Sequence, residues 1–250
     1  MEPKNNRSKF MIDAKNLTTR KLNEKVRKAV RDGNKQIAIH NVMGQRYIAA
    51  GIQGLIEIDI TGIPGNDLGV FMDGPKVVVH GNGQDVIGNT MNAGEIIIHG
   101  DVGDITGMSA RGGKIYIQGN TGYRTGVHLK EYHGLRPIIV IGGTAQDFLG
   151  EYMAGGLILM LGLNLSDGIH NADYVGTGMH GGTIILRGDV RGMGREVEVH
   201  QLDQEDNRLV EQAVLEYSKH FGCRADEVLG SKFKKLIPIS ARPYGNLYSY

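Results

Sequence analysis

Short apolar runs recur along the chain between polar stretches that are rich in glycine. The clearest runs are residues 77–79 (VVV), 96–98 (III), 115–117 (IYI), 138–140 (IIV), 158–160 (ILM) and 184–186 (IIL). Runs of this length that are dominated by β-branched residues and bounded by glycine are typical of β-strands. The stretches between them are too short for helical crossovers and lack the helical period. The pattern therefore predicts strands joined by tight corners.

A repeat relates these runs to one another. Glycines occur at 19-residue spacing in two series, and longer steps extend both series towards the end of the chain. The first series is Gly62, Gly81, Gly100, Gly119, Gly142, Gly162 and Gly188, and the second is Gly69, Gly88, Gly107, Gly126, Gly150 and Gly176. A fixed period of this size indicates a solenoid with one coil per repeat, and parallel connections are right-handed. The sequence therefore predicts an all-β protein, a right-handed parallel β-helix of about eight coils.

The glycines mark the corners of the coils. A corner needs either a positive φ angle or the close approach of the next coil, and both exclude a Cβ atom. Asn82, Asp101, Asn120 and Asp189 each follow a glycine of the first series. They suit such corners because Asn and Asp tolerate the left-handed conformation and bond the local backbone, so we expect them to form ladders. An inward slot is expected three residues after each second-series glycine, at Met72, Met91, Ala110, Leu129, Met153 and Met179.

Alternation along the strands predicts that one residue of each run points outward. These residues are Asp59, Val78, Ile97, Tyr116, Ile139, Leu159 and Ile185, and six of the seven are apolar. An apolar stripe of this length is not expected to face water. Either the chain's own terminal segments or a partner protein covers it. The candidate partner contacts on this stripe are Val78, Ile97, Tyr116 and Ile139.

The two open ends of a solenoid need caps. One helix is predicted from Thr18 or Thr19 to Gly33, and a second from Asp203 to Gly222. The extended, aromatic segment LIPISARPYGNLYSY that follows is interpreted as a docking tail. The expected organisation is an N-terminal helical cap or arm, a parallel β-helix, and a C-terminal helix with its tail, over residues 1–36, 37–200 and 201–250.

The composition limits the choice of partners. The 28 Lys and Arg residues nearly balance 27 Asp and Glu residues, so no bias towards nucleic acid or membranes is expected. The longest uncharged apolar run, residues 152–165, is too short to span a bilayer, and the opening segment lacks a secretory signal, which favours a cytoplasmic protein. The single cysteine, Cys223, excludes an internal disulfide and a cysteine-ligated cluster. We therefore expect protein partners and no cofactor on this chain, and self-association is left open.

Two insertions, residues 126–137 and 162–182, interrupt the repeat and are the candidate contact loops. Their candidate partner contacts are His128, Lys130, Glu131, Tyr132 and His133 in the first and Asp173 and Tyr174 in the second. Both also offer general acid–base groups, but contact with a partner is the favoured interpretation. His80 and His99 fall at equivalent corners and are interpreted as a surface ladder. No Walker loop, nucleophile elbow or His-Glu-x-x-His motif is present, so no catalytic, cofactor-binding or metal-binding residue is predicted.

The repeat resembles a known domain. Its spacing Gly-x-x-Gly-x-x-x-Gly, from Gly100 to Gly107 and from Gly119 to Gly126, is followed by segments such as MSARGG and YMAGG. This pattern resembles the C-terminal β-helix domain of the glutamate synthase large subunit over roughly residues 35–190. The resemblance is closest to the split form of that enzyme, in which the domain is a free-standing chain. A similar coil occurs in a small subunit of formylmethanofuran dehydrogenase.

The resemblance implies a scaffold. In the glutamate synthase family, an amidotransferase part releases ammonia from glutamine. A synthase part that carries FMN and an iron–sulfur cluster joins the ammonia to 2-oxoglutarate and reduces the product. This chain has no cysteine nucleophile after Met1 and no cluster cysteines, so the resemblance implies that these activities and cofactors belong to partner chains. Two other interpretations remain, a corresponding subunit of formylmethanofuran dehydrogenase or another amidotransferase-linked enzyme, and an independent carbohydrate-active β-helix enzyme.

Overall fold

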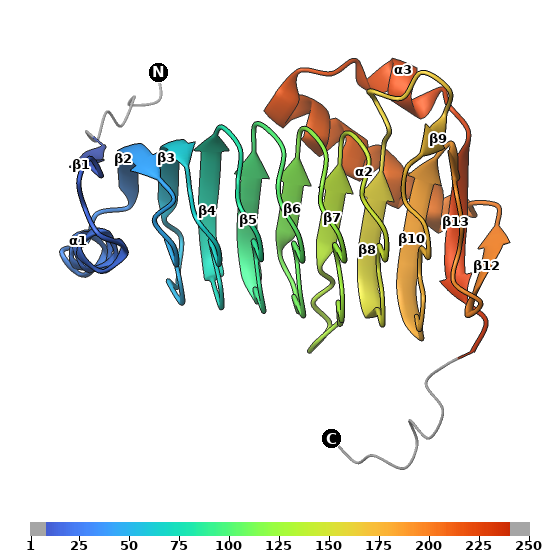
Figure 1. The fold of residues 1–250 in the computed structure, drawn as a ribbon, viewed down its shortest axis with the longest axis horizontal. Helices are drawn as coiled ribbons and strands as arrows, with labels where there is room; N and C mark the ends of the chain where they lie inside the picture. Colours follow the sequence, from blue (N-terminus) through green and yellow to red (C-terminus); the bar gives the residue numbers. More distant parts are fainter. Residues whose placement is uncertain (1–8, 241–250) are drawn as a thin grey trace, which may run out of the picture.

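The computed structural model describes residues 9–240, and its main feature is one sheet of eleven strands in the order β1-β2-β3-β4-β5-β6-β7-β8-β10-β13-β12 (Figure 1). These strands are β1 Phe10–Asp13, β2 Gln36–Met43, β3 Glu57–Ile63, β4 Asp73–His80, β5 Ala93–Ile98, β6 Lys114–Ile117, β7 Ile138–Ile141, β8 Ala154–Met160, β10 Gly181–Arg187, β12 Val197–His200 and β13 Phe233–Pro238. A second sheet pairs β9 (Ile169–His170) with β11 (Asp189–Val190). From β1 to β10 every pair in the main sheet is parallel. The predicted parallel β-solenoid of about eight coils is confirmed.

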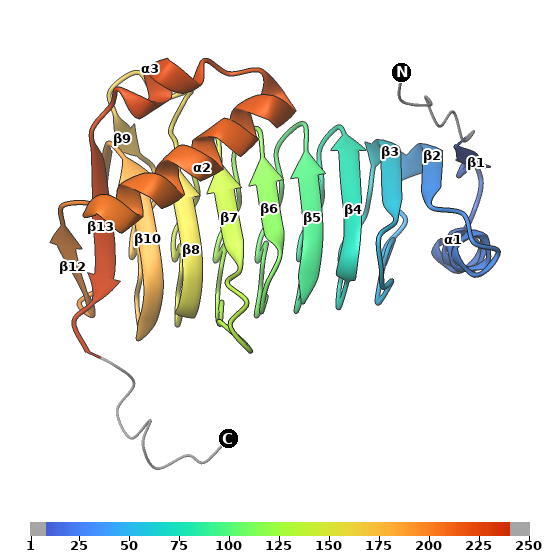
Figure 2. The same cartoon turned by 180° about the vertical axis from the view of Figure 1, so that it is seen from behind.

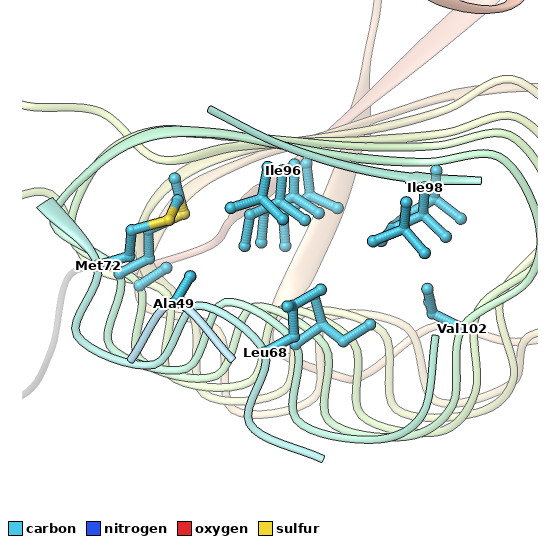
Figure 3. Packing of buried hydrophobic residues seen from close by; sticks show 14 of the residues in the cluster. Ala49, Leu68, Met72, Ile96, Ile98 and Val102 are labelled. Atoms are coloured by element: carbon cyan, nitrogen blue, oxygen red, sulfur yellow. The ribbon is translucent and has the colours of Figure 1, made fainter. Parts of the chain in front are cut away.

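Each coil encloses a flat apolar interior (Figure 3). Ile96 and Ile98 point inward from β5, Leu68 faces them from the back wall, and Met72 and Val102 close the two sides. Full burial of one such side chain contributes about 1.5–3 kcal/mol, and the repeat multiplies this contribution along the stack. The predicted slot residues are all buried here, namely Met72, Met91, Ala110, Leu129, Met153 and Met179.

The second glycine series was predicted at the corners, but it lies on the back wall, where the wall passes close to the facing strands. Gly107 has a φ of +75°, and a Cβ atom on it would lie 2.4 Å from Cδ1 of Ile139 in the facing strand. Ile105 and Ser109, two residues to either side, also have positive φ angles, of 61° and 53°. Sequence reasoning assigned such angles to Gly, Asn and Asp, so the β-branched Ile105 is unexpected. Its N–H donates to the carbonyl oxygen of Tyr123 in the next coil at 2.8 Å, and this bonding between coils holds the conformation.

The Asn and Asp residues of the other corner form the predicted ladder. The side chain of Asn82 accepts a hydrogen bond from the N–H of Asp101 at 3.0 Å. Asp101 accepts from the N–H of Asn120 at 2.6 Å, and Asn120 from that of Thr144 at 3.0 Å. A Cβ atom on Gly119 would lie 2.2 Å from Oδ1 of Asp101. Position 119 therefore requires glycine, because the side chain of Asp101 in the preceding coil occupies the space that a Cβ atom would need.

Helix α1 (Thr19–Arg31) covers the first open end of the solenoid, beside β1 (Figure 1). The side chain of Thr18 accepts an N–H of the first turn, as a capping residue does. Leu22, Val26 and Ala29 are buried in the solenoid core. The predicted helix therefore closes this end with its apolar face.

Helix α2 (Gln204–Phe221) lies along the outer face of the main sheet (Figure 2). A capping box of Asp203 and Asp206 begins it, and Gly222, with a φ of 74°, ends it, as the sequence predicts. The short helix α3 (Ala225–Leu229) follows. The second helix was expected as an end cap, but antiparallel strands β13 and β12 extend the sheet at that end instead. The helix lies on the sheet because its apolar face matches the apolar stripe there.

Part of the predicted docking tail is a strand. Leu236 in β13 pairs with Ile184 of β10 and is 1 % exposed. Asp189 was predicted to belong to the ladder of Asn82. Its carboxylate instead forms an ion pair with Lys234 of the same strand β13. Residues 241–250 of the predicted tail lie outside the described residues.

Helix α2 covers the outward stripe of the strands. One apolar cluster joins Val210, Ala213, Val214 and Tyr217 of the helix to the outward side chains of the sheet. The sheet residues in this cluster include Val78, Ile97, Tyr116, Val140, Leu159 and Ile185. The chain itself, rather than a partner protein, therefore buries most of the stripe.

The sequence pattern assigns Ile139 to this stripe, and that assignment is wrong. In the paired strands, Ile139 lies beside Ile115 and Val140 lies beside Tyr116. Ile139 points into the solenoid interior, and Val140 takes the outward position. The four apolar residues of β7 follow an insertion, so the pattern leaves their register open by one residue. A slip of one residue exchanges the two faces of a strand.

Candidate partner-binding surface

Three candidate contacts lie beneath α2 and are inaccessible. Val78, Ile97 and Tyr116 are 9 %, 1 % and 0 % exposed. The Tyr116 hydroxyl donates a hydrogen bond to Glu216 of α2. Burial, followed by this contact with the carboxylate, raises the pKa of Tyr116. The prediction that these three residues contact a partner is wrong, because they bind the chain's own helix.

A polar network holds α2 at the same place. Nζ of Lys114 lies 2.6 Å from Oε2 of Glu216, and Gln212 donates to Oε1 of Glu216 at 3.1 Å. Burial opposes the ionised form of Glu216, but the hydrogen bonds from Lys114, Tyr116 and Gln212 outweigh it and lower its pKa to about 2. Apolar packing and a charged network therefore act together to fix the helix on the sheet.

The candidate contacts of the first insertion are all exposed, namely His128, Lys130, Glu131, Tyr132 and His133. Glu131 anchors this loop to the next coil, since its Oε1 accepts the N–H of Gly156 at 3.1 Å and lies 3.3 Å from Nε of Arg136. The guanidinium carbon of Arg111 lies 5.6 Å from the ring centroid of Tyr132. The loop therefore presents basic and aromatic side chains from a fixed frame.

The second insertion contributes to a stacked column of side chains. The N–H of Asp173 donates to Asp147 at 3.0 Å, and Oδ1 of Asp173 accepts the N–H of Tyr174 at 2.9 Å. Tyr174 is 52 % exposed and stacks on Phe148 with ring centroids 5.1 Å apart. The guanidinium carbon of Arg124 lies 4.9 Å from the centroid of Phe148. Arg124, Phe148 and Tyr174 thus form a continuous column on three successive coils.

Four residues further along the same coils lies a groove of about 640 Å³. The side chains that give it its character are Arg111, His128, Lys130, Tyr152 and His180. The rings of His128 and Tyr152 stack with their centroids 5.4 Å apart and 12° between their planes. Nδ1 of His180 lies 3.1 Å from the carbonyl oxygen of Gly178, which orients its ring. Glu196 adds a carboxylate to the lining, so the groove combines aromatic, basic and acidic side chains, and it is open to solvent.

Sequence reasoning found only part of this surface. His128 and Lys130 were candidates because they lie in an insertion, but Arg111, Phe148 and Tyr152 lie outside the two insertions. Arg111 and Tyr152 belong to the MSARGG and YMAGG segments of the repeat, which carried no prediction of partner contact. The available signal was the register between coils. The N–H of His128 donates to the carbonyl oxygen of Glu151 at 3.0 Å. Because Glu151 directly precedes Tyr152, the side chains of His128 and Tyr152 occupy the same position of neighbouring coils.

The other candidate chemistry has structural roles. His170 is buried, with Nε2 2.8 Å from the carbonyl oxygen of Arg187 and Nδ1 3.3 Å from the hydroxyl of Thr144, and burial lowers its pKa. A neutral ring that donates through Nε2 and accepts through Nδ1 satisfies both contacts. His80 and His99 stack with centroids 5.2 Å apart, as predicted. Within residues 9–240, no group of three or more His, Cys, Asp or Glu side chains is placed to hold a metal ion, and no helix has the length and apolarity needed to cross a bilayer.

Comparison with known proteins identifies the family of this chain. The family model described as the GXGXG motif matches residues 7–239. An uncharacterised protein of Methanocaldococcus jannaschii is 48% identical in an alignment of 250 positions. The alignment covers 96% of this chain and 96% of that protein. A chain in the crystal structure of the formyltransferase/hydrolase complex of Methylorubrum extorquens, solved with methylofuran, has the same fold, with a TM-score of 0.62 and 20% identity over 95% of this chain and 98% of that chain. The glycine repeat, the solenoid built on it and these matches agree, and the chain belongs to the GXGXG motif family.

Proposed function

We propose that this chain is a non-catalytic scaffold subunit of a glutamate-synthase-like oxidoreductase. In this role it holds a glutamine amidotransferase chain and an FMN-dependent synthase chain in relation to one another. FMN and the iron–sulfur cluster belong to the synthase chain in this proposal, and the scaffold itself binds neither.

The proposal rests on the contacts of three ionisable side chains in the insertions, each of which bonds another part of the chain itself. His170 bonds two other segments of the solenoid, Glu131 bonds the next coil, and Asp173 bonds the backbone of its own loop. These groups build a rigid frame. The aromatic and basic side chains beside them, such as Tyr174 and Arg111, remain exposed, as expected for a surface that binds proteins.

A second candidate is the corresponding scaffold of an amidotransferase-linked or formylmethanofuran-dehydrogenase-type complex. The fold shared with a chain of the Methylorubrum extorquens formyltransferase/hydrolase complex favours it. That chain also works within a multi-subunit assembly, so both candidates make this solenoid a structural subunit. They differ in the chains that it joins.

Affinity purification of the tagged chain from its source organism, followed by native mass spectrometry, tests the two candidates. Glutaminase and flavin-containing chains that co-purify at fixed stoichiometry support the first candidate, and formyltransferase or hydrolase chains support the second. Recovery of the chain alone under gentle, low-salt conditions contradicts both. Turnover of glutamine or of a polysaccharide by the purified chain contradicts its non-catalytic role.

A further inference from the structure

We propose that the segment after Ser240, residues 241–250, binds along the groove beside Tyr152 of the same chain. This inference goes beyond the scaffold function, because it concerns how the chain occupies its own surface and not which partners it joins. It gives the predicted docking tail a specific binding site. Three observations support it, namely the place where the chain leaves β13, the length of the groove, and the order of the side chains along it.

The last described residue of the chain lies in the groove itself. Ser240 lines the groove together with Glu196 and Tyr152. A backbone hydrogen bond fixes this position, since the N–H of Ile239 donates to the carbonyl oxygen of Glu196 at 2.8 Å. The carboxylate of Glu196 accepts the N–H of Gly178 at 3.1 Å, which holds Glu196 at the edge of the groove. The segment that follows therefore begins at the groove and needs no linker to reach it.

The groove follows the stacking direction of the coils, and the segment is long enough to fill it. The N–H groups of Ser109, His128 and Tyr152 each donate to the next coil, at 2.9, 3.0 and 2.9 Å. Gly178 follows the acceptor of Tyr152, and Glu196 lies beyond Gly178. Coils repeat at roughly 4.8 Å, so the four steps from Glu196 to Ser109 span about 19 Å. About six extended residues cover this distance, and the segment has ten.

The charges of the segment follow the same order as the charges of the groove. Arg242 comes two residues after Ser240, at the end of the groove where Glu196 supplies a carboxylate. A guanidinium and a carboxylate pair well in this geometry because both are planar. Arg111 and Lys130 line the other end of the groove. The segment is uncharged after Arg242, so it brings no like charge towards them.

The tyrosines of the segment suit the floor of the groove. In an extended segment every second side chain lies on the same face, so Arg242, Tyr244 and Tyr248 share one face. The floor holds the stacked rings of His128 and Tyr152, and Tyr152 is 47 % exposed. Aromatic rings that pack together contribute more than the burial of their area. One face of the segment therefore offers a cation for Glu196 and rings for the floor.

The covalent connection favours this segment over a separate chain. A short connection gives the segment an effective concentration in the millimolar range at the groove, and it avoids most of the entropy cost of association. A separate partner that enters the groove would have to displace the segment first.

Tryptophan fluorescence of the full chain tests this docking. The sequence contains no tryptophan, so Tyr248→Trp introduces a single reporter. We expect acrylamide to quench this indole at least about threefold less than the same indole in a free peptide of residues 241–250, since a docked ring is mostly buried. Tyr152→Ala should raise the quenching to that of the free peptide. The matched control Tyr47→Ala removes a tyrosine that is also 47 % exposed but lies outside the groove, and it should leave the quenching unchanged.

Charge reversal tests the pair between Glu196 and Arg242. In the Tyr248→Trp chain, Glu196→Arg or Arg242→Glu alone should increase the quenching. The double variant should restore most of the shielding, because it restores the pair with opposite polarity. Far-ultraviolet circular dichroism verifies folding, and Arg242→Glu provides the measurement if Glu196→Arg does not fold.

Four results would overturn the proposal. Quenching equal to that of the free peptide would show that the segment is not docked, and shielding that Tyr152→Ala leaves intact would place the segment elsewhere. Shielding that disappears on dilution would show that a second copy supplies the groove. Shielding that appears only when partner chains are added would assign the segment to their interface. Because the first three measurements use the isolated chain, they leave the scaffold function untouched.

Discussion

The hydroxyl of Tyr217 donates a hydrogen bond of 3.0 Å to the carbonyl oxygen of Gln118, and this contact joins α2 to the coil that follows β6. Tyr217 is 1 % exposed. Gly142 in the next coil makes room for it, because a Cβ atom there would lie 1.9 Å from the Tyr217 oxygen. Close packing of α2 on the coils at this point therefore depends on the side chain of Tyr217 and on the absence of a side chain at Gly142.

Replacing Tyr217 tests how much this contact stabilises the fold. Tyr217→Ala removes a fully packed ring and should lower the free energy of unfolding by about 3–5 kcal/mol. Tyr217→Phe keeps the ring and loses only the hydrogen bond to Gln118, so a loss of about 1 kcal/mol is expected. Urea unfolding followed by circular dichroism measures both. Similar small losses for the two variants would show that α2 contributes little to global stability.

Two glycines with the same backbone angle separate the cost of a positive φ from the cost of crowding. Gly107 and Gly134 both have a φ of +75°, but an added Cβ meets Ile139 at 2.4 Å in the first case and nothing within 4 Å in the second. Gly134→Ala should cost about 1–2 kcal/mol from the backbone alone. Gly107→Ala should cost about 1–3 kcal/mol more, because the interior is overpacked. Equal losses in urea unfolding would contradict the flat, tightly packed interior.

Adjacent residues of α2 test whether the helix is buried on one face. Val214 is fully buried against the strands, whereas Leu215 is 42 % exposed. Val214→Gln should destabilise the protein by at least about 2 kcal/mol, since it loses packing and buries an amide. Leu215→Gln should change the stability by no more than about 0.5 kcal/mol. Limited proteolysis should cut within α2 earlier in the first variant, and equal cleavage rates would argue against docking of the helix.

Glu216 predicts a specific pH dependence of stability. Its pKa is about 2 in the fold, compared with an ordinary value of 4.5, so folding favours the ionised form. The stabilisation is present above pH 4.5 and is lost as the pH falls from about 4.5 towards 2. The advantage of the wild type over Glu216→Gln in the free energy of unfolding should therefore shrink across this interval. An advantage that does not change with pH there would rule out a stabilising role for the Glu216 charge.

Local features were predictable because their causes are local. The 19-residue glycine spacing indicated the coils, since the same close approach recurs in every coil and excludes a Cβ at the same position each time. The ladder from Asn82 to Asn120 followed from the same period. Thr18 and Gly222 marked helix ends, because a capping side chain or a left-handed glycine acts on its own turn. The register of β7 was not predictable, because Ile139 and Val140 are both apolar and an insertion interrupts the period before them.

The sequence by itself determined that the protein is a stack of glycine-cornered coils with an apolar stripe that something must cover. Only the tertiary structure decided that α2 covers Tyr116, about 100 residues earlier in the chain, and that Arg111, His128 and Tyr152 meet at one groove. Periodicity reports which side chains share a face, because that depends on backbone geometry alone. Which distant segment packs on that face depends on the fit of two surfaces, and no repeat in either segment encodes that fit.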